Sequence, residues 1–432
     1  FPALPMDLTS DDTWMFNAKH NLQLNKEYLK TWNTTVFASF VDHKMDNLLK
    51  NLDPRMLNAS TDAQTKNYGA RTEGQWMLKN GKLYLGADYK VEAAKGIRER
   101  EFLMGPNAGK IVEDNAWQDS QISKTGIFTE YHFHKSTIMY VMSGRLEVNN
   151  AQVSDATPEF IAVNPETSIT QINPGVSIGA VKNAKEGFNM GLWLGRAQRS
   201  GSLTERYINY FPVGLDPYEM VGNPSILPEV NNQVDINIGY RKSKTNIEVS
   251  AFGSYLQDYI SSEIRADLSP KIPSSPGVRQ FINLDKASMY GFELAWSQIL
   301  IGGLQHSFNL AYTHGENTVD NEPLPEIAPL DVRYTLSGSY LDGKLNPEIS
   351  FRYVMQQDRI ATSYGETETP AFNLLDFKIE YQVLKTLKAV GGVNNLFDTA
   401  YYEHLNRSVK GTKDAINAPG RNVFIMLTLD LM

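Results

Sequence analysis

Residues 421–432 read RNVFIMLTLDLM, and from Val423 onward every second side chain is aliphatic. One face of this stretch carries Val423, Ile425, Leu427, Leu429 and Leu431. The other face carries Phe424, Met426, Thr428 and Asp430. Because successive side chains of a β-strand point to opposite faces, the stretch predicts a strand with one face in lipid and the other toward water. A chain that stops on such a strand is typical of the last strand of a closed membrane barrel, in which no strand edge is left unpaired.

The same alternation recurs along the whole chain. In 374–383 and in 233–241, apolar side chains on one face alternate with charged and amide side chains on the other. Charged inward faces on nearly every strand cannot fill a dry core, because a buried charge without a partner is costly, so these faces must line water. The pattern predicts an all-β fold: a transmembrane antiparallel β-barrel, with about 17 strands visible.

Two kinds of connection join these strands. Short polar turns are predicted at 79–82, 183–187, 242–245, 302–303 and 341–344. The Asn-Gly pair in 79–82 and the Asp-Gly pair in 341–344 supply the positive φ of hairpin turns. Long connections rich in Asn, Pro, Gly, Ser and Asp are predicted at 46–66, 101–118, 154–167, 200–230, 265–280, 320–331, 361–370 and 403–419. Outer-membrane barrels have short periplasmic turns and long external loops. If the C-terminus is periplasmic and strand directions alternate, the second strand (about 28–45) runs outward and ends at an external loop.

Composition narrows the class of partner. The chain has 432 residues and a formal net charge of −8, which argues against a nucleic-acid partner, since that would require a basic surface. An acidic chain suits a vestibule that attracts cations or cationic complexes. There is no run of 18 or more apolar residues, which excludes helical membrane spans, and there is no cysteine, which excludes disulfides and thiolate ligands.

Two groups of motifs carry a family likeness from about residue 117 onward. The motifs are Ser202–Tyr207, Gly222–Pro224, Leu227–Glu229, Gly392–Asp398, Tyr401-Tyr402 and Pro419–Arg421. In their order and spacing they resemble TonB-dependent receptors of the Gram-negative outer membrane. The resemblance implies a 22-stranded barrel around an N-terminal plug, so that 1–432 would be the barrel portion, with the plug and roughly five first strands missing. It also implies active import powered by the TonB-ExbB-ExbD complex through the plug, contact with outer-membrane lipid and lipopolysaccharide, no enzymatic reaction and no organic cofactor.

The N-terminal part resembles the copper receptors within that family. The matching motifs are Leu4–Asp7 and Val41–Asn47, and the likeness assigns His43 and Met45 as copper ligands. Thioether sulfur with imidazole favours Cu(I) over harder ions, and side chains two residues apart on a strand share a face, so both can point into the lumen. The cysteine and methionine ligands that the family carries on its plug have no counterpart in this chain.

Weaker metal candidates lie elsewhere. His132 and His134 share one face of a strand near the predicted periplasmic end and could form a way-station for a metal ion. Met56, in the connection after His43, and Met220, in the connection 200–230, are further candidate copper contacts, although methionine more often fills gaps in packing.

Two alternatives remain open. The first keeps the fold and changes the ligand to a ferric siderophore or haem, which Tyr207, Tyr210, Phe211 and Tyr218 could bind. The second is a plugless structural subunit of a surface complex or an outer-membrane hydrolase. The hydrolase would need a Ser or Thr nucleophile beside a histidine such as His314 or His404, and no nucleophile motif occurs at a recognisable spacing.

Overall fold

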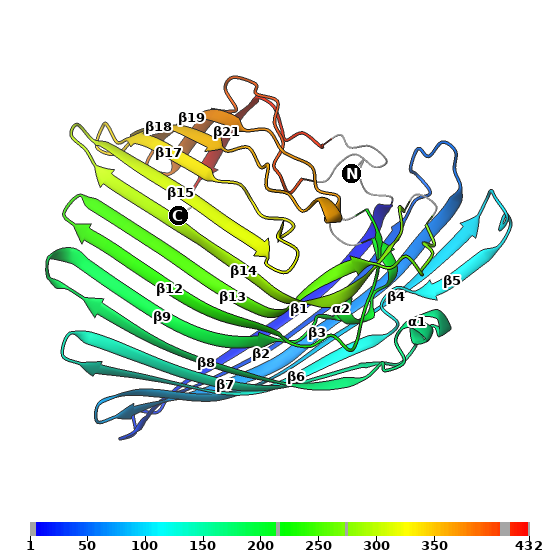
Figure 1. Cartoon of the computed structure of the whole chain (residues 1–432). Coiled ribbons are helices and arrows are strands. Elements are labelled where there is room, and N and C mark those ends of the chain that lie inside the picture. Colours follow the sequence, from blue (N-terminus) through cyan, green and yellow to red (C-terminus); the bar gives the residue numbers. More distant parts are fainter. Residues whose placement is uncertain (1–5, 213–216, 273–274, 407–414, 431–432) are drawn as a thin grey trace.

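The protein is a single curved β-sheet of 21 strands, seen in a computed structural model that describes residues 6–212, 217–272, 275–406 and 415–430. Four strands are short and lie at the rim or inside: β5 (Ile111–Asn115), β10 (Asn209–Pro212), β11 (Glu219–Val221) and β16 (Glu322–Pro323). The other 17 form one continuous antiparallel meander (Figure 1), which agrees with the predicted number.

The strands of the meander are β1 (Asp7–Gln23), β2 (Leu29–Asp46), β3 (Leu57–Leu78), β4 (Gly81–Phe102), β6 (Ser120–Lys135), β7 (Ile138–Val153), β8 (Ile169–Asn183), β9 (Phe188–Arg199), β12 (Glu229–Lys242), β13 (Thr245–Ile264), β14 (Val278–Ile299), β15 (Leu304–Asn317), β17 (Asp331–Gly338), β18 (Leu345–Val354), β19 (Phe372–Leu384), β20 (Leu387–Asn394) and β21 (Asn422–Leu429). The helical elements are α1 (Pro158–Val163), α2 (Leu203–Tyr207) and the 3-10 turns η1 (Lys185–Gly187) and η2 (Thr362–Tyr364). None of the helices in the described ranges is long and apolar enough to cross a bilayer.

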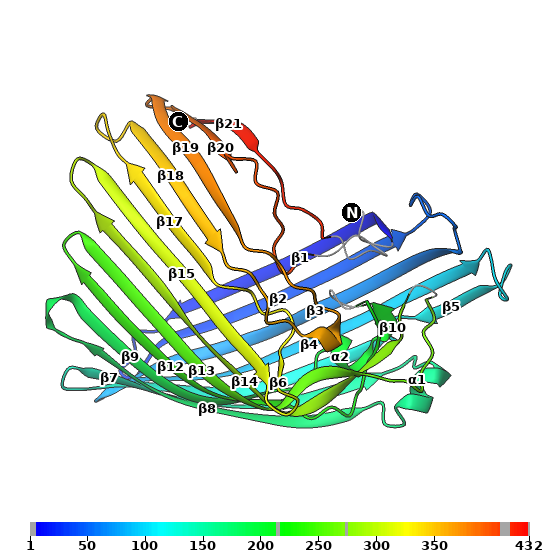
Figure 2. The ribbon, with the colours of Figure 1, turned by 45° about the horizontal axis from the view of Figure 1, so that its top comes forward.

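The sheet curves into a trough whose two edge strands are not joined to each other. Among the described residues β1 pairs only with β2, and β21 pairs only with β20 (Figure 2). The closure predicted from the C-terminal strand is therefore not made between the described residues of β1 and β21.

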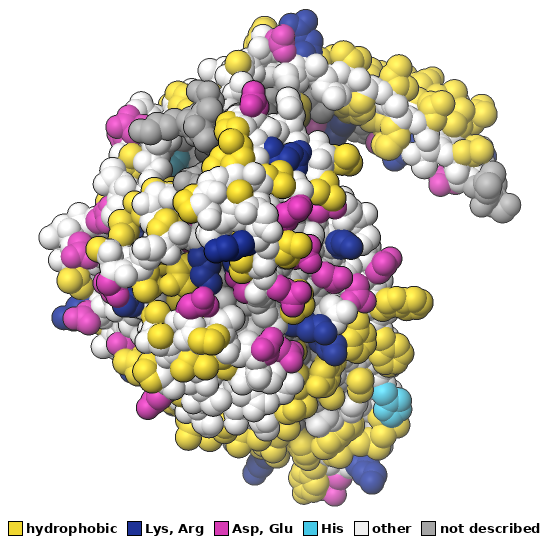
Figure 3. Space-filling view, turned by 90° about the vertical axis from the view of Figure 1, so that its right-hand side faces the viewer, with side chains coloured by type: hydrophobic (Ala, Val, Ile, Leu, Met, Phe, Trp, Pro, Cys, Tyr) yellow, Lys and Arg dark blue, Asp and Glu magenta, His cyan; other side chains and the backbone are white. Residues whose placement is uncertain are grey.

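The two faces of the wall differ as the alternation predicts. On β8 the outer row Ile172, Val176 and Ile178 is exposed, whereas Gln171 and Asn173 on the inner row are buried and hydrogen-bonded. Figure 3, turned toward the end with the long connections, shows charged side chains spread over that end and hydrophobic side chains gathered along its outer margins.

Short turns lie at one end of the trough and long connections at the other, as predicted. The Gly302-Gly303 turn between β14 and β15 has φ values of 69° and 77°, the left-handed conformation expected there. The predicted connection 46–66 was too long, because β3 begins at Leu57 and its polar residues belong to the water-facing wall. The stretch 200–230 is also not a simple loop, since it contains α2, β10 and β11.

These three elements fold into the trough rather than away from it (Figures 1 and 2). Ser202 caps α2 in a reciprocal capping box with Glu205, and Thr157 caps α1. Behind them lies a small apolar core of buried side chains from both helices, the inner strands and the wall: Ile122, Ala151, Phe160, Tyr207, Tyr210, Val221 and Val278. The apolar core thus fixes what we call the inner segment, residues 203–221, of which 213–216 lie outside the described ranges.

Candidate functional site

The predicted pair His43 and Met45 lies on β2, close to the end of the trough with the long connections. In the strand register His43 is opposite Asp11 on β1, and Met45 is opposite Thr61 on β3. The Nδ1 atom of His43 lies 3.2 Å from Oδ2 of Asp11. Val36 and Phe40 occupy the alternate positions of β2, whose side chains point to the opposite face from His43 and Met45, and they are exposed on the outer face. His43 and Met45 therefore share the inner face, as their spacing predicts.

A second methionine lies beside this pair. The hydroxyl of Thr61 donates a weak hydrogen bond to the sulfur of Met6 at 4.0 Å, and both residues are buried. Because Thr61 is the direct cross-strand neighbour of Met45, the Met6 thioether lies next to the Met45 position on the same inner face. Met6 belongs to the motif Leu4–Asp7, in which the family resemblance identifies no ligand. Leu4 and Pro5 lie outside the described residues.

The donors near Met45 are two thioethers, which are soft, and one imidazole, which is of intermediate softness. Within the described ranges, no group of three or more His, Cys, Asp or Glu side chains is placed to hold a metal ion. A centre built from two thioethers and one imidazole suits Cu(I), whereas Zn²⁺ and Mg²⁺ prefer thiolate, imidazole or oxygen ligands. The inner face thus carries two soft thioethers and one imidazole close to one another along neighbouring strands.

The structure does not bring the two weaker methionine candidates to this pair. Met56 comes just before β3, four residues before Ser60, which is the register partner of Asp46 on β2. Four residues of extended chain span on the order of 13 Å, so Met56 lies away from the pair. Met220 is buried on β11, where it pairs with Phe211 and Arg279 on a different part of the wall.

His132 and His134 lie near the short-turn end of β6, at the opposite end from His43, as predicted. The Nε2 atom of His132 lies 2.5 Å from Oε1 of Glu130, and its ring packs on Tyr84 with 5.4 Å between the ring centroids. His134 is opposite Met139 in the strand register. These contacts give His132 a structural partner, and among the described residues no group of three or more His, Cys, Asp or Glu side chains includes the two histidines.

The aromatic residues of the siderophore alternative belong to the inner segment. Tyr207 is fully buried, and its hydroxyl donates to the carbonyl of Thr167 at 3.0 Å. Tyr210 is 6% exposed and lies under the Lys271 ammonium, 4.5 Å from the ring centroid. Phe211 packs against Trp117 and Arg98, and Tyr218 packs against Arg279. Most of these rings therefore pack within the fold instead of forming an open loop surface.

The two histidines of the hydrolase alternative are also engaged. His314 stacks on Tyr290 and contacts Glu316 and Arg359. His404 lies 2.8 Å from the hydroxyl of Thr369, which is 4% exposed.

Glu366 completes that second cluster at the long-connection end. Its carboxylate lies 3.7 Å from Nε2 of His404 and accepts hydrogen bonds from the backbone N–H groups of Glu326 and Ala361. Burial raises the pKa of Glu366, but the hydrogen bonds from His404 and the backbone outweigh it and hold this pKa below its usual value. Glu366, His404 and Thr369 hold the long connections to one another, and the Thr369 hydroxyl is buried from solvent.

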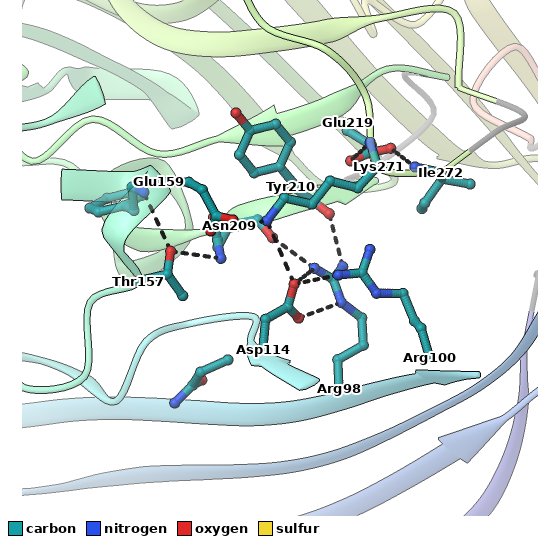
Figure 4. Close-up of polar contacts among 12 residues, drawn as sticks. Arg98, Arg100, Asp114, Thr157, Glu159, Asn209, Tyr210, Glu219, Lys271 and Ile272 are labelled. Carbon is teal, nitrogen blue, oxygen red and sulfur yellow. Dashed lines mark hydrogen bonds and ion pairs between the residues drawn. The ribbon is translucent and has the colours of Figure 1, made fainter. Parts of the chain in front are cut away.

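A buried ionic cluster on the inner face of β4 was not predicted (Figure 4). Asp114 on β5 accepts two hydrogen bonds from Arg98, both 2.8 Å, and one from Arg100 at 2.7 Å. Arg98 also donates to the backbone carbonyls of Tyr210 (2.8 Å) and Asn209 (3.2 Å). Both arginine side chains and Asp114 are no more than 6% exposed. We call Arg98, Arg100 and Asp114 the arginine clamp, because it fastens β10 to the wall.

The pKa values in this cluster follow from burial and charge. Burial raises the pKa of Asp114, but the hydrogen bond and charge of Arg98 and the charge of Arg100 outweigh it and leave this pKa below its usual value. Burial also raises the pKa of Glu219, and backbone N–H donors from Lys271 and Ile272 only partly oppose that rise. The alternation along β4 is enough to direct Arg98 and Arg100 inward. Their contacts with Asp114 and β10 depend on tertiary structure.

The comparisons with known proteins agree with this architecture. A model of the TonB-dependent receptor-like β-barrel family matches residues 3–396. Among solved structures, the chain is similar to the copper transporter OprC, with 20% identity and a TM-score of 0.85 over 99% of this chain and 66% of that one. It is also similar to the FrpB iron transporter from Neisseria meningitidis (14% identity, TM-score 0.68, 96% of this chain and 63% of that one).

A third similar structure is the ferric yersiniabactin uptake receptor FyuA from Yersinia pestis (12% identity, TM-score 0.68, 98% of this chain and 61% of that one). The chain thus spans slightly less than two thirds of the length of these structures, and at such identities the likeness shows the fold alone. No sequence among the curated proteins matches the chain. The family match covers most of its length, and the family consists of outer-membrane transporters and receptors of Gram-negative bacteria, not enzymes. The chain belongs to the TonB-dependent receptor β-barrel family.

Proposed function

We propose that the chain is the barrel portion of an outer-membrane importer of copper, energised by the TonB-ExbB-ExbD complex through a plug carried by the whole receptor. The observation that supports this most is the gathering of soft donors on the inner face. His43 and Met45 share that face, and the sulfur of Met6 lies beside the neighbour of Met45. The transported ligand would be a metal ion bound directly, in the reduced state that thioethers prefer.

Asp11 would act on the metal through His43. A ligating histidine usually donates its second ring N–H to a carboxylate or carbonyl, which fixes the tautomer and turns the other nitrogen to the metal. The 3.2 Å contact between Nδ1 and Asp11 provides such a partner and leaves Nε2 of His43 for copper. The inner end of the site would be completed by the plug, whose movement would release the ion inward.

Copper binding to the whole receptor in detergent tests the proposal. Purified protein is titrated anaerobically with Cu(I) against a competing chelator, comparing the wild type with Met45→Leu. Loss of one of three ligands should weaken the affinity by at least roughly tenfold, since even partners outside the ligand set change metal affinity 10- to 100-fold. Met142→Leu is the matched control, because Met142 lies on the outer face of β7 and is 45% exposed.

The alternative ligands give different results in the same assay. No response to Cu(I), together with tight binding of a ferric siderophore or haem, would replace copper by a metal chelate. Anomalous X-ray signal from a copper-soaked crystal adds a positional check: copper between His43, Met45 and Met6 supports the site, and copper elsewhere removes it. A full-length gene without a plug would favour the structural subunit over an importer.

A further inference from the structure

Four short turns at the end of the trough opposite the proposed copper site carry an excess of positive charge. They are 241–245, 300–303, 341–344 and 384–386, which join β12 to β13, β14 to β15, β17 to β18 and β19 to β20 (Figure 1). Together they contain five basic residues and one acidic residue, whereas the whole chain has 41 Lys and Arg against 49 Asp and Glu. Because the short turns of an outer-membrane barrel face the periplasm, this acidic chain presents a basic surface there.

The four turns form one continuous row. In three backbone hydrogen bonds of 2.8–2.9 Å, the N–H group of one residue donates to a carbonyl group in the preceding turn: Ile299 to Lys244, Ser339 to Gly303, and Gln382 to Lys344. Consecutive turns are two strands apart, which is about 10 Å, so the row is on the order of 30 Å long. We call these four turns the turn row.

Apolar side chains stand at the tips of three consecutive turns of this row. Ile301 is 86% exposed, Leu341 is 61% exposed and Leu384 is 60% exposed. The outward aromatic residues Trp296 and Tyr381 belong to the girdle at the membrane boundary, and Ile301 and Leu384 come three or more residues after them. Three residues of extended chain span on the order of 10 Å, so these tips lie beyond the girdle, in water. One exposed apolar side chain is ordinary on a protein surface, but a row of three indicates an interaction site.

Unpaired lysines lie between the apolar tips. Lys244, Lys344 and Lys385 are exposed, and none of them forms an ion pair with a carboxylate in the described part of the chain. Lys344 belongs to the same turn as Leu341, and Lys385 follows Leu384 directly. The other two cations of the row already pair with carboxylates, at 3.2 and 3.3 Å. The turn row therefore alternates apolar contacts with cations that have no counter-charge of their own.

We propose that the turn row docks an acidic protein of the periplasm, whose carboxylates pair with the three unpaired lysines and whose apolar side chains cover the three exposed tips. Complementary charge would speed the encounter, and the apolar contacts would slow dissociation. A protein fits this surface better than membrane lipid does, because the tips point away from the bilayer, beyond the aromatic girdle. The turn row is part of the wall, so the proposal is independent of the transported ligand and of the plug through which the TonB complex would act.

The test uses the whole receptor in nanodiscs of a zwitterionic phospholipid, which leave both ends of the barrel accessible. The probe is a fluorescent peptide of glutamate and leucine residues, and the same peptide with glutamine in place of glutamate is the uncharged comparison. We expect the acidic peptide to bind more tightly, with an affinity that falls as the salt concentration rises. Lys344→Gln combined with Lys385→Gln should weaken its binding by roughly twofold to fivefold per lysine, and should leave the glutamine peptide unaffected. Ile301→Ser should weaken the binding of both peptides by roughly tenfold, because it removes a buried apolar contact.

Matched controls come from the long-connection end of the barrel. Lys110→Gln combined with Lys286→Gln removes two exposed cations there, and Leu49→Ser removes an apolar side chain that is 87% exposed, close to the 86% of Ile301. Both controls should bind the acidic peptide as the wild type does.

Three results would overturn the proposal. The first is equal binding of the two peptides, or binding that the changes in the turn row leave unaltered. The second is loss of acidic-peptide binding in nanodiscs that contain phosphatidylglycerol, which would assign the lysines to lipid headgroups. The third is light scattering that shows two receptor copies joined in the wild type and separated by Ile301→Ser, which would make the row an interface between copies of this chain.

Discussion

The arginine clamp yields a prediction whose size can be worked from burial. Asp114→Asn keeps the shape of the side chain but removes the charge that neutralises Arg98 and Arg100. All three side chains are at most 6% exposed, so the two guanidinium groups would be left in a poorly solvated place. Breaking one partner of a buried ion pair costs about 3–5 kcal/mol, because the remaining charge is uncompensated.

We expect this cost to appear as local opening of the inner segment, not as unfolding of the wall. In the register β10 joins β11 through three residue pairs and β11 joins β14 through three, whereas β13 and β14 share a ladder of 19 pairs. The weakly held elements open first. A cost of about 3–5 kcal/mol corresponds to an increase of about 10²- to 10⁴-fold in the opened population.

Hydrogen exchange measured by mass spectrometry on the whole receptor in detergent can detect this change. Peptides from β10 and β11 should lose protection, while peptides from β13 keep it. The matched control is Asp267→Asn, since Asp267 makes a similar two-bond pair with Arg265 but is 63% exposed, and solvent-exposed pairs contribute little to stability. If Asp114→Asn left the protection of β10 and β11 within twofold of the wild type, the clamp would not be what holds the inner segment.

Three further outcomes follow from the structure. Gly222→Ala should destabilise the inner segment by about 1–3 kcal/mol, because the added Cβ would lie 2.4 Å from backbone atoms in the last turn of α2; exchange of α2 peptides measures it. The pKa of Glu366 is lowered in the folded state by His404 and by backbone donors. The ionised carboxylate therefore stabilises the fold above its unfolded pKa, and this contribution is lost as the pH falls through the lower folded pKa. Hydrogen exchange of the connection 361–370, corrected for the intrinsic pH dependence of exchange, should rise only in strong acid. Asp11→Asn should weaken Cu(I) binding by roughly 10- to 100-fold without changing the fold, because it removes the charged partner of His43; chelator competition and circular dichroism report the two effects.

Much of the wall could be predicted because its determinants are local. Strand positions follow from alternation within ten to twenty residues, and the shared face of His43 and Met45 follows from their spacing alone. Their neighbours depend on register as well. Asp11 reaches His43 because the turn after β1 sets the pairing of β1 with β2, and a shift between Leu8 and Ser10 then changes the register next to Met45. The place of Met6 therefore could not be read from the sequence.

The inner segment could not be predicted for a different reason. Its composition of Asn, Pro, Gly and Tyr resembles that of an external loop, and the strands inside it are only three or four residues long. Elements this short have little local signal. They form because Arg98 and the apolar core give their backbone and side chains partners that lie about a hundred residues away in the chain, as the contact of Arg98 with Tyr210 shows.

One row of residues across the inner face connects the clamp with the proposed metal ligands. In the register Leu8 is opposite Met45, Met45 is opposite Thr61, Thr61 is opposite Arg98, and Arg98 is opposite Asp114. With neighbouring strands about 4.8 Å apart, the backbones at Met45 and Arg98 are about 10 Å apart. The row combines two kinds of element: long ladders of backbone hydrogen bonds hold the donors rigidly, while a few side-chain bonds hold the inner segment beside them. Because a rigid site binds without reorganising, any movement that admits an ion should occur in the weakly held segment, and the donors on the wall should keep their positions.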